Sequence, residues 1–261
     1  VCGSDLPRML VKGAHRMPII CGHEFSGHVE TLGEGVEGPA LGDLCTVAPL
    51  LPCRRCDQCA TGDFSRCRNY DYFGSRRDGA YAEWVVVPVG NLLRAPAGTD
   101  PRAAAMTDPA SIALHAIWKA GGIRLGARGA VIGCGPIGLF AIQWMRLMGA
   151  REIVAIDLSE RKLDLAREAG ATHCLLSGEP VPADLLADLT IEAAGHPASI
   201  NAAVSLAGPG GHVVFIGIPV GEVALSNAAF QHFLRQETSL HGSWNSFGAP
   251  FPGPQWNVAL D

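Results

Sequence analysis

The segment "GAVIGCGPIG", residues 129–138, restricts the possible fold more than any other stretch of the chain. It begins as an apolar run, typical of a buried strand, and is followed by apolar residues at helical spacing. Gly133, Gly135 and Gly138 form the pattern G-x-G-x-x-G between these two elements. Such glycines allow a tight turn, close approach of the backbone to a pyrophosphate, and close packing of helix on strand. The segment therefore predicts a dinucleotide-binding unit, and the alternative is a tight turn without a ligand.

Strands and helices alternate after this motif. Helical patterns at residues 159–170, 197–206 and 227–235 alternate with apolar runs in "EIVAID", "HCLLS", "DLTIEAAG", "HVVFIGIP" and "TSLHGSW". Elements in this order form right-handed crossovers and a parallel, doubly wound sheet. We therefore expect an α/β fold for the second half of the chain.

An acid at the end of the second of these strands bears on the choice of cofactor. Asp157 follows Gly138 by 19 residues. A carboxylate there accepts hydrogen bonds from the ribose hydroxyls of adenosine and repels a 2′-phosphate, so the sequence favours NAD over NADP. If the glycine motif is only a turn, Asp157 is a helix-capping acid. Lys162 could also reach the ribose, and the alternative for it is a solvated charge on a helix.

The first half has a different pattern. Short apolar runs in "GHVETLG", "DLCTVAPLL" and "AEWVVVPVG" are separated by glycine and proline, and a long helical pattern first occurs in "ASIALHAIWKAGG". This pattern predicts a β-rich domain with irregular loops.

Composition excludes several classes of protein. Apolar residues make up 48% of the chain and charged residues 17%, which is typical of a compact globular protein. The net charge of −5 argues against nucleic-acid binding, and no apolar run is long enough for a transmembrane helix. Nine clustered cysteines in a chain of this size favour reduced thiols in a cytoplasmic protein over a disulfide framework. Because Val1 is not an initiator methionine, the sequence leaves open whether a signal peptide precedes it.

Four of the cysteines have the spacing of a closed metal site. Cys53, Cys56, Cys59 and Cys67 follow the pattern C-x2-C-x2-C-x7-C. Four thiolates can bind one tetrahedral zinc ion at about 2.3 Å and leave no position for water or substrate. The alternative, a nucleic-acid-binding finger, needs a basic surface and a base-reading helix, and neither is evident. The cluster therefore predicts a structural zinc.

A second set of residues predicts a catalytic metal site. Cys2 and the pair His23 and Glu24 offer a thiolate, an imidazole and a carboxylate, and Asp108 could supply the carboxylate instead of Glu24. Three protein ligands leave the fourth position of zinc open for water or substrate. Taken singly, Cys2 reads as a small buried side chain and His23 as a core histidine, so the prediction depends on their occurrence with the other motifs.

Together the motifs resemble one known family. "CGSD", "GHEFSG", the four-cysteine cluster, "DPASIALHA", "GCGPIG" and "AID" resemble, in this order, the zinc-dependent medium-chain dehydrogenases of the polyol, threonine and sorbitol branch. The resemblance implies an α/β protein with a GroES-like catalytic domain at residues 1–118 and a Rossmann NAD-binding domain at 119–245, with the active site in the cleft between them. Residues 246–261 would begin a return to the catalytic domain. Family members usually run longer at both ends, so we expect further segments before Val1 and after Asp261.

The resemblance also implies roles for individual residues. Cys2 and His23 match the first two catalytic zinc ligands, and Glu24 matches a glutamate that binds zinc or lies beside it. Asp108 stands where this branch usually has a glutamate ligand, and the shorter arm would favour contact through water. Ser4 matches the hydroxyl of the proton relay, whereas Pro7 stands where a relay histidine often follows. Positions that contact the cofactor correspond to Gly133, Gly135, Pro136, Ile137, Gly138, Asp157, Lys162, Ile216 and Ile218.

The implied function is an oxidoreductase that transfers a hydride from a secondary alcohol of a polyol or polyol phosphate to NAD, with one catalytic and one structural zinc. "CGSDLPR", "PLLPC", "FGSRRDG" and "GSWNSFGAP" resemble the galactitol-1-phosphate 5-dehydrogenases most. Oxidation of threonine, sorbitol or butanediol, and a catalytically inactive paralogue, are the alternatives. Arg8, Arg76 and Arg77 are candidates to bind a substrate phosphate, or else solvated loop charges. We expect a cytoplasmic homodimer or homotetramer that binds neither nucleic acid nor membrane.

Overall fold

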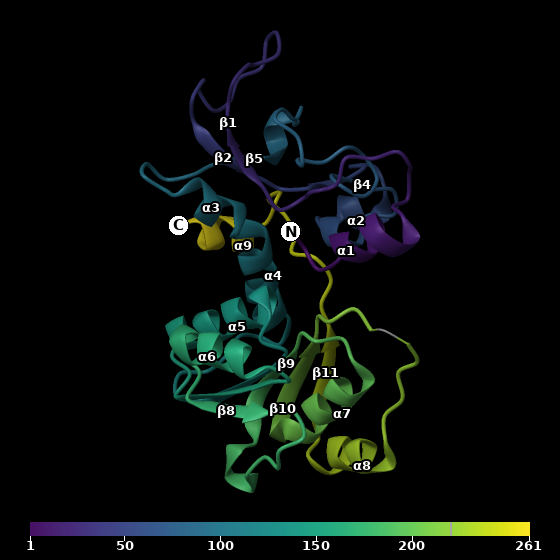
Figure 1. Cartoon of the computed structure of the whole chain (residues 1–261), viewed down its shortest axis with the longest axis vertical. Coiled ribbons are helices and arrows are strands. Elements are labelled where there is room, and N and C mark those ends of the chain that lie inside the picture. Colours follow the sequence, from purple (N-terminus) through teal and green to yellow (C-terminus); the bar gives the residue numbers. More distant parts are fainter. Residues whose placement is uncertain (220) are drawn as a thin grey trace. The chain divides into compact units, whose positions relative to one another are not determined.

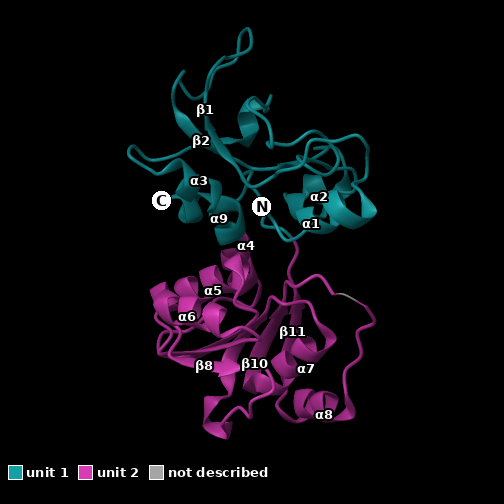
Figure 2. Ribbon diagram, viewed as in Figure 1, with its two compact units in different colours: residues 1–111, 245–261 teal, residues 112–244 magenta. Residues whose placement is uncertain are grey.

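The computed structural model describes residues 1–219 and 221–261. The chain divides into two compact units, which Figure 2 shows in different colours. Unit 1 consists of residues 1–111 and 245–261, and unit 2 of residues 112–244. The division falls within helix α4 (Thr107–Lys119), which also contains the boundary expected from the sequence. Among the described residues no helix combines the length and apolar character needed to cross a membrane.

Unit 2 contains the predicted parallel sheet, of which Figure 1 labels β8, β9, β10 and β11. In the described residues the strands have the order β11-β10-β9-β6-β7-β8. The strands are β6 (Arg128–Ile132), β7 (Glu152–Asp157), β8 (His173–Leu176), β9 (Ala187–Glu192), β10 (Ala207–Phe215) and β11 (Ser239–Gly242). The helices are α5 (Pro136–Leu147), α6 (Glu160–Ala169), α7 (Pro197–Leu206) and α8 (Asn227–Arg235), with a 3-10 turn, η4, at Ala183–Leu185. The doubly wound α/β prediction is therefore confirmed. The strand order reverses between β6 and β9, the place where sheets of this type bind their ligands.

Alternate residues of these strands pack on opposite faces of the sheet. Val131 and Ile153 lie in one core with Ile142 of α5 and Leu163 of α6. The other core lies against α7 and contains Ala130, Ile132, Val154, Ile156, Ala203 and Leu206. Because both faces are covered, the central residues of these strands are mainly apolar, which is why the strands form apolar runs in the sequence.

Unit 1 contains two small antiparallel sheets, and its elements are short. Strands β1 (Ser26–His28), β2 (Leu44–Val47) and β5 (Leu92–Arg94) form an antiparallel sheet, and β3 (Leu50–Leu51) pairs with β4 (Asp71–Tyr72). The short helices are α1 (Asp5–Pro7), α2 (Asp57–Ala60), α3 (Pro101–Ala105) and α9 (Pro254–Leu260). The remaining turns are the π-helical η1 (Arg8–Lys12) and the 3-10 turns η2 (Phe64–Arg66) and η3 (Val89–Asn91).

The prediction of a strand at "AEWVVVPVG" is wrong. Residues 82–88 are not assigned to a strand, and the sequence "VGN" at Val89–Asn91 forms η3. Trp84 is 69% exposed and Val86 is 89% exposed. The apolar run is present, but a strand also needs a neighbouring backbone to complete its hydrogen bonds. No described segment pairs with this one in a ladder.

The last residues of the chain pack against the cysteine-rich segment within unit 1. Trp256 of α9 is fully buried and stacks on Phe247 with ring centroids 5.5 Å apart. Both lie in one apolar cluster with Cys59 and Cys67. Ser65 and Phe247 share three hydrogen bonds. The Ser65 backbone N–H and hydroxyl donate to the Phe247 carbonyl at 3.0 and 3.1 Å, and the Phe247 N–H donates to the Ser65 hydroxyl at 2.8 Å. The cysteine segment and the chain end therefore form one packed region.

Candidate metal centres and dinucleotide site

Unit 1 brings together the three residues predicted to hold a catalytic metal. Cys2 precedes α1, and His23 and Glu24 lie in the loop that leads to β1. One ligand atom from each residue lies within 4.8 Å of the others. A thiolate, an imidazole and a carboxylate at this separation suit zinc, which accepts sulfur, nitrogen and oxygen ligands.

The carboxylate of Asp5 contacts two of the three predicted metal ligands, Cys2 and His23. This carboxylate is 1% exposed and accepts hydrogen bonds from the Cys2 backbone N–H at 3.2 Å, the Tyr81 hydroxyl at 3.1 Å and Arg8 Nη1 at 3.1 Å. Its Oδ1 atom also lies 3.3 Å from Nδ1 of His23. Burial raises the pKa of Asp5, but His23 first, and then Tyr81 and the Cys2 N–H, lower it below its ordinary value. A carboxylate on one imidazole nitrogen leaves the other nitrogen free for a metal.

Asp108, in the first turn of α4, adds a further buried carboxyl group. It is 2% exposed, and its Oδ1 atom has no hydrogen-bond partner among the described residues. Burial raises the pKa of Asp108 to about 7, and the nearby charge of Glu24 adds to this effect, whereas His23 opposes it. Asp108 lies outside the 4.8 Å group of Cys2, His23 and Glu24. A buried carboxyl with an unpartnered oxygen, near the charge of Glu24, fits a site built for a cation.

The charge around His23 leads to the same conclusion. Burial lowers the pKa of its imidazole, but hydrogen bonding to Asp5 and to Cys2, together with the charge of Asp108, raises it to about 10. The surroundings therefore favour a positive charge at this point. A divalent cation bound to the neutral imidazole would supply that charge.

Ser4 lies beside the metal ligands. Its hydroxyl donates a hydrogen bond to Sγ of Cys2 at 3.3 Å. Pro7, where a relay histidine was considered, is the last residue of α1. Ser4 therefore places a hydroxyl next to the site, and its role as a proton relay stays a prediction.

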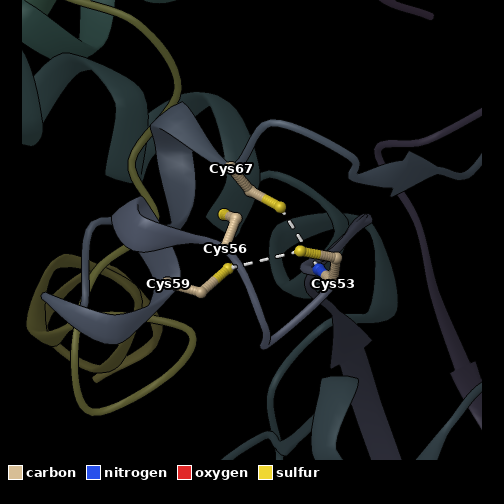
Figure 3. A group of neighbouring side chains, drawn as sticks. All are labelled: Cys53, Cys56, Cys59 and Cys67. Atoms are coloured by element: carbon tan, nitrogen blue, oxygen red, sulfur yellow. Dashed lines mark hydrogen bonds between the residues drawn. The ribbon is translucent and has the colours of Figure 1, made fainter.

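The four cysteines of the second site point their sulfur atoms toward one another (Figure 3). All four sulfurs lie within 4.8 Å of each other, and those of Cys53 and Cys59 are 4.0 Å apart. A tetrahedral zinc with bonds of about 2.3 Å places its sulfur ligands about 3.8 Å apart, so the arrangement fits this ion. Backbone N–H groups of Arg68 and Cys59 lower the pKa of Cys56 to about 6, which favours the thiolate that binds metal.

The glycine motif of unit 2 lies where its sequence predicted, between β6 and α5. Gly133 has φ = +94°, in the left-handed region, and its N–H donates to the carbonyl of Ile156 at 2.8 Å. A side chain at Gly138 would collide with the carbonyl of Gly133, whereas one at Gly135 would meet nothing within 4 Å. The protein's own packing thus requires the first and third glycines, and the second leaves open space beside the start of α5. A phosphate in that space would meet the free N–H groups of the helix.

Asp157 connects the end of β7 to this loop. The carboxylate is 8% exposed and accepts hydrogen bonds from the backbone N–H of Cys134 at 2.8 Å and of Ser159 at 3.0 Å. Nζ of Lys162 lies 3.7 Å from Oδ2. The acid predicted to bind ribose therefore also holds the glycine loop against the neighbouring strand.

Comparison with known proteins identifies the family. Residues 136–253 match the model of the zinc-binding dehydrogenases, and residues 1–97 match that of the alcohol dehydrogenase GroES-like domain. Galactitol 1-phosphate 5-dehydrogenase of Escherichia coli K12 is 39% identical over 99% of this chain and 77% of its own length. The chain belongs to the zinc-binding alcohol dehydrogenase family.

Other members show the breadth of this family. L-threonine 3-dehydrogenase of Bacillus subtilis is 33% identical over 86% of this chain and 68% of its own length. A crystal structure of galactitol-1-phosphate dehydrogenase from E. coli superposes on the whole chain, and on 77% of that enzyme, with a TM-score of 0.93 and 38% identity. The crystal structure of a putative zinc-binding dehydrogenase from Sinorhizobium meliloti 1021 bound to NADP matches with a TM-score of 0.89 and 30% identity. The match covers the whole of the present chain and 78% of the other. The protein is therefore an oxidoreductase with a GroES-like and a Rossmann part, as predicted.

Four further residues of this dehydrogenase were predicted to contact the cofactor: Pro136, Ile137, Ile216 and Ile218. Ile137 and Ile216 are half-buried and pack against the core of unit 2, and Ile218 is 61% exposed. Pro136 is the first residue of α5. These assignments to the cofactor site stay predictions, because they derive from the resemblance alone.

Sequence reasoning missed Asp5, Tyr81 and Glu192. Asp5 follows Cys2 by three residues, and its position in "CGSD" was the available signal, since a carboxylate next to a metal ligand often orients that ligand. Glu192 ends a mostly buried strand, which is an unusual position for a charged residue. Tyr81 gave no signal, because its contact with Asp5 joins residues 76 positions apart.

Proposed function

We propose that this dehydrogenase oxidises a secondary alcohol of a polyol phosphate with NAD and one catalytic zinc ion. The observation that carries the proposal is the grouping of Cys2, His23 and Glu24 within 4.8 Å, next to the buried and unpartnered carboxyl of Asp108. Such a donor set around a buried excess of negative charge is what a catalytic zinc requires.

Cys2, His23 and a carboxylate would hold the metal. Glu24 is the first choice for that carboxylate, because it belongs to the close group and Asp108 does not. Bound zinc would act as a Lewis acid that lowers the pKa of the substrate hydroxyl. The four cysteines at positions 53, 56, 59 and 67 would hold a second, structural ion with no open position.

Two residues of the chain would manage the proton and the ligand geometry. Ser4, whose hydroxyl already reaches Cys2, can accept the proton of the substrate hydroxyl and donate its own onward. Asp5 would keep the imidazole of His23 in one orientation through the 3.3 Å contact to Nδ1. NAD supplies the hydride acceptor, and Asp157 favours it over NADP because a 2′-phosphate would meet a carboxylate.

The three arginines considered for the phosphate differ in their partners. Arg8 is 3.1 Å from buried Asp5, and Arg77 is 3.6 Å from Asp71. Arg76 instead lies over the ring of Tyr70, with its guanidinium 4.5 Å from the centroid, and its buried Nε has no hydrogen-bond partner among the described residues. Arg76 is therefore the arginine with hydrogen-bonding capacity to spare.

The loop that carries Arg76 is linked to the predicted metal ligand His23 through Tyr72. The backbone N–H of Arg76 donates to the carbonyl of Tyr72 at 3.0 Å. The ring of Tyr72 in turn contacts the ring of His23 edge to face, with centroids 5.6 Å apart. A substrate hydroxyl at the metal and a phosphate at Arg76 would thus be bound by connected parts of unit 1.

A substrate panel tests the proposed function. The purified protein would be assayed with NAD and with NADP on galactitol 1-phosphate, galactitol, sorbitol, threonine and 2,3-butanediol. We expect reduction of NAD with the polyol phosphate, and a kcat/KM at least about 10-fold above that of each unphosphorylated alcohol, since a charge-assisted hydrogen bond contributes about 1.5–3 kcal/mol. A higher kcat/KM for threonine would instead favour the threonine 3-dehydrogenase activity of the relative from B. subtilis.

A pair of variants tests the phosphate contact. Arg76→Ala should lower kcat/KM for the polyol phosphate by about 10- to 100-fold and leave that for the free polyol unchanged. Arg77→Ala is the matched control, because its charge is already paired with Asp71. Equal effects of Arg76→Ala on phosphorylated and free polyol would show that Arg76 does not bind the phosphate.

A further inference from the structure

Glu192, the last residue of β9, carries a carboxylate that is 0% exposed. Glutamates are almost never fully buried unless a cation or several hydrogen-bond donors accompany them. Three donors meet the Oε1 atom of Glu192: the backbone N–H groups of Ala194 at 3.0 Å and Gly195 at 2.8 Å, and the hydroxyl of Ser199 at 2.7 Å. The side chain thus fixes the turn at residues 193–195, directly after its own strand.

The second carboxylate oxygen shows that packing alone does not explain this residue. Oε2 of Glu192 is buried and has no hydrogen-bond partner in the part of the chain that the structure describes. An unpaired polar atom in the interior lowers stability, so a position selected only for packing would favour an apolar side chain. Polar groups kept at such a cost occur mainly at functional sites.

On one side, the turn held by Glu192 touches the glycine loop of the dinucleotide site. A Cβ atom built on Gly133 would lie 2.8 Å from the backbone nitrogen of Ala194. The N–H of Ala193 donates to the carbonyl of Ile132, the last residue of β6, at 2.8 Å. The turn and the glycine loop are therefore in direct backbone contact, and a shift of one would displace the other.

On the other side, the turn touches residues 216–218, which follow β10. The N–H groups of Ile216 and Gly217 donate to the backbone carbonyl of Glu192 at 2.9 and 3.1 Å. A Cβ on Gly217 would lie 2.7 Å from Oε2 of Glu192 and 2.7 Å from Cα of Gly195. Glu192 thus contacts this loop through both its backbone and its side chain.

We propose that Glu192 is a positioning residue for the dinucleotide: through the turn at residues 193–195 it sets the distance between the Gly133 loop and residues 216–218. These segments lie at the carboxyl ends of β6, β9 and β10, around the point where the strand order reverses, which is where sheets of this type bind nucleotides. Glu192 itself does not need to touch the ligand. The inference rests on the proposed use of a nicotinamide dinucleotide.

The test compares dinucleotide binding in Glu192→Ala, Glu192→Gln and the wild type. Titration of each protein with NADH, followed by nicotinamide fluorescence, gives Kd, and steady-state kinetics give KM for NAD and for the alcohol. Glu192→Ala removes the acceptor of all three hydrogen bonds, and we expect a Kd at least about 10-fold higher with KM for the alcohol unchanged. Glu192→Gln keeps an oxygen for the same donors and should restore Kd to within about threefold of the wild type.

Ile153→Ala is the control for a loss of stability alone. Ile153 is fully buried in unit 2 and lies near the opposite, amino end of β7. This variant should lower the melting temperature without a change in Kd for NADH. If Glu192→Ala likewise lowers the melting temperature but leaves Kd within about twofold of the wild type, Glu192 is a structural residue and the inference is wrong.

A milder variant covers the case in which Glu192→Ala does not fold. Ser199→Ala removes one of the three donors and leaves the carboxylate in place. We expect Kd for NADH to rise by about threefold, and an unchanged Kd would overturn the inference. Failure of the wild type to bind NADH or NADPH would refute the proposed function itself, which distinguishes the two failures.

Discussion

Trp256 offers a sharp test of the packing in unit 1. The substitution Trp256→Ala removes a fully buried indole that stacks on Phe247 and donates from Nε1 to the hydroxyl of Ser246 at 3.1 Å. Truncation of a buried tryptophan costs about 3–5 kcal/mol. The lost hydrogen bond adds about 1 kcal/mol or less, because Ser246 keeps its 2.8 Å contact with the hydroxyl of Ser111. We therefore expect a loss of about 4 kcal/mol.

Differential scanning calorimetry measures this loss. At about 2–4 °C per kcal/mol, the transition of unit 1 should fall by at least about 8 °C. Because Trp256 shares an apolar cluster with Cys59 and Cys67, a zinc chelator should also remove the metal from the cysteine site faster than in the wild type. Trp256→Phe keeps a ring for the stack on Phe247 and should lose less than half as much. A transition temperature within about 2 °C of the wild-type value, with an unchanged rate of metal release, would refute the coupling between Trp256 and the cysteine site.

Two further predictions concern unit 2. Burial first, and then the charges of His212 and Lys119, lower the pKa of His241, so the folded state prefers the neutral imidazole, and the free energy of unfolding should fall as the pH drops below about 6.5. Urea unfolding between pH 7 and pH 5 measures this dependence. The free energy of unfolding should fall less steeply with decreasing pH in His241→Gln than in the wild type, and equal slopes would contradict the role of His241. Asp157→Asn should raise the ratio of kcat/KM for NADP over NAD by at least about 10-fold, since the charge that repels a 2′-phosphate is gone. An unchanged ratio would show that Asp157 does not select the cofactor.

Local sequence patterns predicted much of unit 2. Helices α7 and α8 occur at the residues expected, and each begins with its own capping signal: the nitrogen of His196 accepts from Ala198 N–H, and the hydroxyl of Ser226 accepts from Ala229 N–H. The four-cysteine group could likewise be identified from spacing, because all its ligands lie within seventeen residues, 51–67. Features encoded within a short stretch of chain are readable without a structure.

Features that depend on distant segments could not be read in this way. The run "AEWVVVPVG" has the β-branched and aromatic residues of a strand, but pairing is a property of two segments, and only one is visible in the pattern. The role of Asp5 arises from contacts with His23 and Tyr81, which are far away in sequence. The difference between Arg76 and Arg77 likewise depends on which of them finds a carboxylate in the folded unit.

Zinc stoichiometry tests the central claim, that Cys2, His23 and a carboxylate form a metal site separate from the four cysteines. Zinc per chain would be measured by mass spectrometry in the wild type and in Cys2→Ala, after dialysis against metal-free buffer and with circular dichroism to verify folding. The account predicts two zinc ions in the wild type and one in Cys2→Ala, with the remaining ion held by the cysteines at positions 53, 56, 59 and 67. A single zinc in the wild type, or two in Cys2→Ala, would contradict it.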